Sequence, residues 1–281
     1  MVKIRDLRKN AVQELIKAGN DSPVADVDFI FTNLLGVGKT DLIIGEKTLD
    51  AFEAERFLQA LERVKTGEPV QYAVGGCEFM SLWFEVNSDT LIPRSDTEIL
   101  VEAIIERCRN SERLNIFEIG TGSGCISVSL AYYLPRARVT AVDISKGALD
   151  IARGNGDRLG VAERTKFLEC DIMSRFPKFE ILPNVVVSNP PYIPKADIDD
   201  LEKKVKDFEP MTALDGGADG LDFYRRIAGT VPLASCGVLA FEVGIGQAGQ
   251  VAQIMEERFC NIEIVKDLSG IDRVVLGKLK G

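Results

Sequence analysis

The feature that most constrains the fold of this chain is a strand that runs into a glycine loop and then a helix. Residues 115–119 (Asn-Ile-Phe-Glu-Ile) have the apolar character of a buried parallel strand, and residues 120–124 (Gly-Thr-Gly-Ser-Gly) follow directly. Residues 125–134 then continue as an apolar helix. Strand, loop and helix in this order predict an open α/β sheet in which small loop residues let a ligand approach the backbone.

The glycine spacing indicates which ligand this loop suits. A dinucleotide fingerprint, G-x-G-x-x-G, would place its third glycine at position 125, which is Cys125. The third glycine is Gly124, one residue early, and the loop contains no G-x-x-x-x-G-K-[ST] phosphate motif. The pattern E-x-G-x-G-x-G, starting at Glu118, is instead typical of a loop that binds S-adenosylmethionine.

Two further predicted strands end at acidic residues. Residues 139–142 run into Asp143, where a carboxylate can accept from both ribose hydroxyls of an adenosine group. Residues 165–170 run into Asp171, where a carboxylate could accept from an adenine amino group. Either residue could instead cap a helix. The shared strand-end position favours the ribose role for Asp143 and leaves both roles open for Asp171.

A polar tetrapeptide, Asn189-Pro190-Pro191-Tyr192, follows the apolar strand at residues 185–187. Ligands of open α/β sheets bind beyond the carboxyl ends of the strands. The Asn189 side chain offers an acceptor and a donor, the prolines fix the loop, and the Tyr192 ring can stack on a flat group. The run predicts a receptor for a planar group that bears NH2, although a plain strand-to-loop turn is the alternative.

With these motifs in place, the chain resembles the class I S-adenosylmethionine-dependent methyltransferases, and among them the HemK-type protein-(glutamine-N5) methyltransferases of peptide-chain release factors. Asn-Pro-Pro-Tyr is shared with adenine-N6 methyltransferases, so it is not specific to this family. More particular are Pro-Arg-x-x-Thr-Glu at 93–98 and Gly-Gly-x-Asp-Gly-Leu-Asp-Phe-Tyr-Arg at 216–225. Residues 208–210 and 242–244 also fit. One departure is Ile172, where some relatives carry an aromatic residue near the adenine.

The resemblance implies an α/β fold: a seven-stranded Rossmann-like class I methyltransferase sheet with a small N-terminal helical domain, joined by a β-hairpin linker. The expected domains are 1–75 for substrate recognition, 76–94 for the linker and 95–281 for the S-adenosylmethionine-binding methyltransferase domain. The implied reaction transfers a methyl group to the side-chain amide nitrogen of a glutamine in the Gly-Gly-Gln loop of a release factor. The helical domain could also be only a packing lid.

The expected site residues form three overlapping groups. Those for catalysis are Asn189, Pro190 and Tyr192. Those for S-adenosylmethionine are Glu118, Gly120, Thr121, Gly122, Ser123, Gly124, Asp143, Asp171, Ile172 and Asn189. Those for the substrate amide are Asn189, Pro190, Pro191, Tyr192, Arg94 and Glu98. Arg94 and Glu98 lie one helical turn apart, so a purely structural ion pair between them is an equal alternative.

Composition limits the chemistry and the partners. The chain has no histidine, which removes the usual general base and every imidazole metal site, and its six cysteines form no C-x-x-C pair, so no metal is expected. The net charge is −9, and residues 1–75 hold 10 Lys and Arg against 12 Asp and Glu. This balance argues against a nucleic-acid substrate and the adenine-N6 alternative, although a local basic patch could exist. A non-catalytic adaptor would show a degraded loop at Asn189, and the loop is intact.

The remaining expectations concern location and local structure. No window holds 18 uninterrupted apolar residues and the N-terminus lacks an apolar signal core, so we expect a cytoplasmic monomer without membrane contact that acts on a protein partner. The patterns predict helices over 4–18, 23–35, 51–65 and 95–109. They also predict strands over 79–86, 237–241, 262–265 and 273–276, with a turn at 87–89 before residues 91–92.

Overall fold

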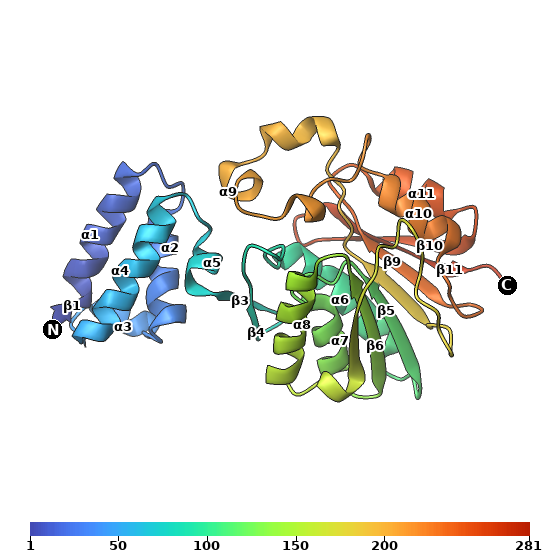
Figure 1. Cartoon of the computed structure of the whole chain (residues 1–281), viewed down its shortest axis with the longest axis horizontal. Helices are drawn as coiled ribbons and strands as arrows, with labels where there is room; N and C mark the ends of the chain where they lie inside the picture. Colours follow the sequence, from blue (N-terminus) through green and yellow to red (C-terminus); the bar gives the residue numbers. More distant parts are fainter. The chain divides into compact units, whose positions relative to one another are not determined.

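The computed structural model describes all 281 residues, and the chain forms two compact units. One unit contains residues 1–77 together with 202–208, and the other contains residues 78–201 together with 209–281. Figure 1 shows the first unit as helical and the second as a sheet flanked by helices.

The first unit packs short helices around one apolar core. Its elements are β1 (Val2–Lys3), α1 (Ile4–Lys17), α2 (Pro23–Phe29), the π-helical turn η1 (Ile30–Leu34), α3 (Lys39–Ile44), β2 (Thr48–Leu49), α4 (Ala51–Lys65), α5 (Val70–Val74) and α9 (Lys203–Lys206). Phe31 and Phe57 stack at the centre of this core with ring centroids 4.3 Å apart. Strands β1 and β2 pair antiparallel beside it.

Local signals explain where the predicted helices begin and end. Asp50 starts α4 with a capping box, because its side chain accepts from the Glu53 N–H at 2.8 Å and the Glu53 side chain accepts from the Asp50 N–H at 2.9 Å. Gly67, with φ of 95°, follows the end of this helix. The helix predicted over 23–35 changes to a π-helical turn at Ile30. Elements α3, α5, β1 and β2 are too short for a periodic pattern and were not predicted.

The prediction of one strand over 79–86 with a turn at 87–89 is wrong. The hairpin instead pairs β3 (Gly76–Phe79) with β4 (Leu82–Glu85), and the chain turns at Met80 and Ser81. Both turn residues have positive φ, 51° and 56°, as a two-residue hairpin turn requires. The usual Asn-Gly signal is missing at Met80-Ser81, so this turn could not be predicted from its residues.

The second unit is built on a seven-stranded sheet, which confirms the predicted fold class. The strands are β5 (Leu114–Ile119), β6 (Ala137–Asp143), β7 (Thr165–Glu169), β8 (Val185–Ser188), β9 (Val238–Glu242), β10 (Phe259–Lys266) and β11 (Asp272–Leu279). Their order is β10-β11-β9-β8-β5-β6-β7, with β11 antiparallel to both of its neighbours and the other pairs parallel. The chain order reverses between β5 and β8, so this edge of the sheet is the expected place for a ligand.

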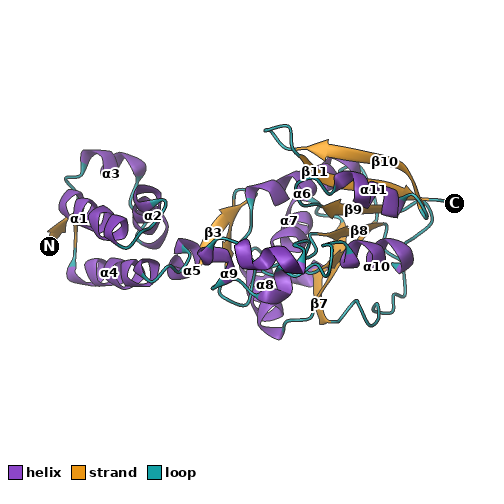
Figure 2. Ribbon diagram, turned by 90° about the horizontal axis from the view of Figure 1, so that it is seen from above, coloured by secondary structure: helices purple, strands orange, loops and turns teal.

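Helices cover both faces of this sheet (Figure 2). They are α6 (Ser95–Cys108), α7 (Cys125–Tyr133), α8 (Lys146–Arg158), α10 (Asp222–Thr230) and α11 (Ala248–Met255). Alternate strand residues divide between two cores: Val185 and Val187 pack with α6 and α7, whereas Val186 packs with α10 and α11. None of the helices is both long enough and apolar enough to cross a membrane.

Candidate active site

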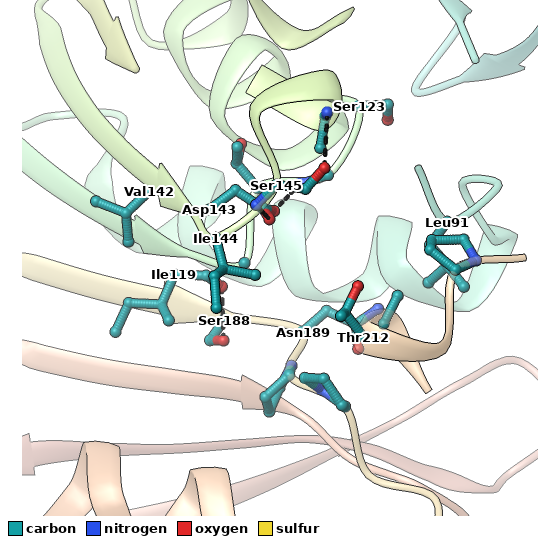
Figure 3. Close-up of a pocket in the computed structure, with 18 of the residues that line it drawn as sticks. Leu91, Ile119, Ser123, Val142, Asp143, Ile144, Ser145, Ser188, Asn189 and Thr212 are labelled. Carbon is teal, nitrogen blue, oxygen red and sulfur yellow. Dashed lines mark hydrogen bonds between the residues drawn. The ribbon is translucent and has the colours of Figure 1, made fainter. Parts of the chain in front are cut away.

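A cavity of about 370 Å³ lies in the second unit at the carboxyl ends of β5, β6 and β8 (Figure 3). The glycine loop after β5, Asp143 after β6 and Asn189 after β8 all line it. Asp171 and Ile172 contribute from the segment after β7. Residues that the sequence places far apart therefore share one cavity.

The glycine loop keeps a backbone that other residues adopt with strain. Gly120, Gly122 and Gly124 have φ of 74°, 53° and 79°. The N–H groups of Gly120 and Thr121 both donate to the carbonyl of Val142, at 2.9 and 3.0 Å, which ties the loop to β6. Gly124 lies outside the cavity lining, and an added Cβ there would lie 3.1 Å from the Cβ of Ala152 in α8. Its role in the structure is to let α7 and α8 approach.

Glu118 lies beneath this loop, fully buried and outside the cavity lining. Its carboxyl group accepts from the Thr121 hydroxyl at 2.5 Å and from the Ser127 N–H at 3.1 Å, while its Oε1 has no partner. Burial raises the pKa of Glu118 to about 7 against the effect of these hydrogen bonds. The contacts make Glu118 a support for the loop.

Sequence reasoning missed Asn155, which also supports the loop. This fully buried side chain donates to the carbonyls of Ser123 at 2.8 Å and Glu85 at 3.0 Å, and accepts from the Glu85 N–H at 2.9 Å. Asn155 falls on the same face of α8 as Ala148 and Ala152. A lone amide on an apolar helix face was the signal that could have found it.

Asp143 turns both carboxylate oxygens towards backbone donors (Figure 3). One accepts from the Gly122 N–H and the other from the Ser145 N–H, both at 2.9 Å. Burial raises its pKa and these N–H groups oppose the shift. Each carboxylate oxygen has a second lone pair, so Asp143 can still accept from a ligand.

Asp171 closes a turn at the cavity wall. It accepts from the Met173 N–H at 2.9 Å and the Ser174 hydroxyl at 2.6 Å, and the Ser174 hydrogen bond is the main reason its pKa is lowered. Ile172 beside it is buried and lines the cavity. Asp171 thus caps a local turn while also facing the cavity.

Asn189 follows β8 directly. The Ser188 hydroxyl fixes the strand end by donating to the Ile119 carbonyl at 2.8 Å. The Asn189 side-chain Nδ2 donates to the Thr97 hydroxyl oxygen at 3.3 Å. Pro190 and Pro191 line the cavity with it, whereas Tyr192 lies outside the lining. Burial, followed by the charge of Glu242, raises the pKa of Tyr192 to about 12.

Residues that lie far along the chain hold the Asn-Pro-Pro-Tyr loop in place. The Gln247 side chain donates to the Tyr192 carbonyl at 2.9 Å and accepts from the Gly244 N–H at 3.1 Å. An added Cβ on Gly216 would lie 2.8 Å from the Tyr192 Cα, and one on Gly220 only 2.3 Å from the Tyr192 carbonyl oxygen. Gly216 and Gly220 are therefore required by their close approach to the Tyr192 backbone.

The structural ion pair that the spacing of Arg94 and Glu98 allowed is not formed, so that interpretation is wrong. Arg94 lines the cavity and pairs with the buried carboxylate of Glu209. Glu98 lies outside the lining and accepts from the Met80 N–H in the hairpin turn. Their partners come from other segments, which local spacing could not reveal.

Two known protein families match separate parts of this chain. Residues 6–75 match the family described as PrmC N-terminal domain, and residues 94–205 match the Methyltransferase small domain. Release factor glutamine methyltransferase of Moorella thermoacetica is 39% identical over 97% of this chain and 97% of its own length. The protein of the same name from Bacillus cereus is 36% identical over 99% of this chain and 100% of its own.

Solved structures agree on the fold alone. The hMettl16 catalytic domain, in complex with an RNA hairpin, has a TM-score of 0.55 at 13% identity, over 90% of this chain and 91% of that one. A methyltransferase from Pyrococcus furiosus has a TM-score of 0.51 at 14% identity, over 83% of this chain and 100% of that one. Since the sequence relatives match along nearly the whole length, the chain belongs to the release factor glutamine methyltransferase family.

Proposed function

We propose that this enzyme transfers a methyl group from S-adenosylmethionine to the side-chain amide nitrogen, N5, of the glutamine in the Gly-Gly-Gln loop of peptide-chain release factors. The observation that carries the proposal is the single cavity that joins the glycine loop and Asp143 to the Asn189 loop. The family relatives, named for this activity, support the choice of substrate.

The residues of the cavity fit S-adenosylmethionine. The glycine loop leaves backbone open beside the N-terminus of α7, which suits the methionine part, and Asp143 keeps lone pairs for ribose hydroxyls. Asp171 and Ile172 lie where the adenine would pack. When bound, S-adenosylmethionine supplies a methyl group already activated by a sulfonium charge, so no acid is needed to activate the donor.

The work of the Asn189 loop is to orient the substrate amide. An amide nitrogen is a poor nucleophile because its lone pair is delocalised into the carbonyl. The Asn189 side-chain carbonyl and the Pro190 backbone carbonyl accept its hydrogens, and Tyr192 flanks the amide plane. Holding the nitrogen in line at roughly 3 to 3.5 Å from the methyl carbon makes attack feasible. The proton can leave afterwards to water.

The unit built from residues 1–77 and 202–208 has a proposed role in recognising the protein substrate. It is acidic overall and the family profile that matches it is separate from the methyltransferase profile. We propose that residues 76–94, which begin with the β3–β4 hairpin, form the linker and that residues 95–281, apart from 202–208, form the catalytic part. We also propose that the protein works as a monomer in the cytoplasm, where release factors act.

The test is methyl transfer from radiolabelled S-adenosylmethionine to a purified release factor, its variant with Ala in place of the loop Gln, and a DNA or RNA control. Label on the intact factor alone supports the proposal. Label on nucleic acid would favour an adenine-N6 methyltransferase, since Asn-Pro-Pro-Tyr suits the NH2 group of either a glutamine amide or an adenine. Absence of label despite cofactor binding would point to another protein substrate or an adaptor.

A further inference from the structure

Glu242 is a buried carboxyl group to which the proposed reaction assigns no task. It ends β9, the strand next to β8, and is 3% exposed, with Oε2 lacking any hydrogen-bond partner. The side chains of Thr97, from α6, and Asn189, from the loop after β8, lie near enough to Glu242 for hydrogen bonding to lower its pKa. A buried carboxylate without a full set of partners is costly and therefore calls for a role.

The Thr97 hydroxyl connects this carboxylate to the catalytic loop. Its oxygen accepts from Asn189 Nδ2 at 3.3 Å, and a hydroxyl has only one proton to donate. An ionised carboxylate can only accept hydrogen bonds. The Thr97 proton is therefore directed to Glu242, and the Thr97 lone pairs are left for Asn189.

This direction of donation fixes the Asn189 amide. A lone pair on Thr97 must meet an N–H, so the amide turns its nitrogen inward and its carbonyl oxygen is left for the cavity that Asn189 lines. A substrate amide brings two N–H groups to the same place. An acceptor there binds it, whereas an Asn189 N–H would repel it.

We infer that Glu242 is a positioning residue that acts on Asn189, directly and through Thr97, to keep the carbonyl oxygen of Asn189 facing the substrate amide. The inference rests on the proposed function, because only a substrate nitrogen that carries hydrogens needs an acceptor at this point. Glu242 itself does not touch the substrate.

The carboxylate charge is the essential property. A Glu242→Gln side chain has almost the same shape but can donate from its NH2 to Thr97, which releases the Thr97 proton towards Asn189. The Asn189 side-chain amide is then expected to flip, which presents its N–H groups to the substrate. Thr97→Val removes the connection that runs through the Thr97 hydroxyl, while Thr97→Ser keeps it.

Protonation of Glu242 should have the same effect as Glu242→Gln. The pKa of Glu242 is raised to about 7, mainly by burial and also by the charge of Asp96, while Thr97, Arg273 and Asn189 oppose the shift. The two tyrosines that face it have pKa values raised to about 12 for Tyr192 and well above 10 for Tyr224, so neither titrates in this range. The carboxylate dominates above about pH 7, so turnover should fall as the pH drops through that value.

The experiment measures kcat, KM for the release factor and S-adenosylmethionine affinity for the wild type, Glu242→Gln, Thr97→Val, Thr97→Ser and the Glu242→Gln/Thr97→Val double variant. Both single changes that break the connection should lower kcat by about 10- to 100-fold with cofactor affinity nearly unchanged. Thr97→Ser should recover most of the turnover that Thr97→Val loses. The double variant should be no worse than the poorer single variant, because both remove one connection.

A matched control is Glu263→Gln on β10. This change removes a carboxylate that pairs with Arg107 of α6, and it should leave kcat unchanged. The fall of wild-type kcat below pH 7 should be absent in Glu242→Gln. Wild-type kcat in Glu242→Gln, additive losses in the double variant, or loss of cofactor affinity together with kcat would overturn the inference. If the wild type itself fails to methylate the release factor, the proposed function has failed instead, so the two failures are distinct.

Discussion

At the scale of single residues, the site separates side chains that hold the cofactor from those that orient the substrate. Asp143 already accepts two backbone N–H groups, and these oppose the rise in its pKa that burial causes. The side-chain nitrogen of Asn189 donates to Thr97, which leaves the side-chain carbonyl oxygen available. The two residues line the same cavity, yet their loss should have different kinetic effects.

For Asn189→Ala we expect turnover to fall by around 100-fold or more, because a positioned polar group is lost from a site that excludes water. Affinity for S-adenosylmethionine should stay close to that of the wild type. Single-turnover methyl transfer together with cofactor titration measures both quantities. Near-normal turnover would remove Asn189 from the mechanism.

For Asp143→Ala we expect the reverse pattern, with cofactor affinity weakened by roughly 1 to 3 kcal/mol as the hydrogen bonds of a charged group to the ribose are lost. Calorimetric titration with S-adenosylmethionine gives this value directly, and Asn189→Ala serves as the comparison. An unchanged dissociation constant would show that this carboxylate contacts no part of the cofactor.

At the scale of elements, the Asn-Pro-Pro-Tyr loop depends on segments that follow it in the chain. Ile193 forms a single parallel bridge with Asp215, and Gln247 at the start of α11 bonds to the Tyr192 carbonyl. Gly220, with φ of 76°, lies against the same carbonyl. The loop geometry is therefore set by two later segments, residues 215–220 and the start of α11.

Gly220→Ala should displace the Tyr192 backbone, because its added Cβ would lie 2.3 Å from the Tyr192 oxygen and 2.8 Å from Gln247 Nε2. We expect a loss of about 1 to 3 kcal/mol in stability, as for other overpacked sites, together with reduced kcat. Gly249→Ala is the matched control, since nothing lies within 4 Å of its added Cβ in α11. Denaturant unfolding and turnover assays would compare the two variants. Equal stability and equal kcat would show that close packing of Gly220 does not hold the Tyr192 loop.

The elements also show what the sequence could and could not reveal. Helices such as α4 and strands such as β5 were predictable because their apolar periodicity and end signals are local. The cavity residues were predictable because motifs at strand ends meet at one edge of a sheet. Arg94 with Glu209, Asn155 with Ser123 and the Met80 turn were not, since each depends on a partner or backbone conformation that only the folded chain brings together.

At the scale of the whole molecule, buried acids connect the site to stability. Glu118 has a pKa raised to about 7 in the folded state by burial, against an ordinary value of 4.5. Between these values the unfolded chain has lost the proton that the folded chain retains. Ionisation of Glu118 therefore lowers the free energy of unfolding as the pH rises from about 4.5 to 7.

Glu118→Gln should remove this dependence, because its amide oxygen can still accept from Thr121 and Ser127 but does not ionise. Relative to the wild type, the variant should gain about 3 kcal/mol between pH 4.5 and 8. Fluorescence of the single tryptophan, Trp83 in β4, follows unfolding of the second unit. A constant difference between variant and wild type at every pH would refute the assignment.

The contact of Gly216 and Gly220 with Tyr192 also limits how the Asn-Pro-Pro-Tyr loop can evolve and how it can be moved into another protein. A side chain added at Gly216 or Gly220 would strike the main chain of Tyr192, so such a change is tolerated only with an accommodating change in the Tyr192 loop. The two stretches then evolve as one heritable module, although separate parts of the gene encode them. Transplanting the Asn-Pro-Pro-Tyr loop into another scaffold would require carrying the glycine segment along with it.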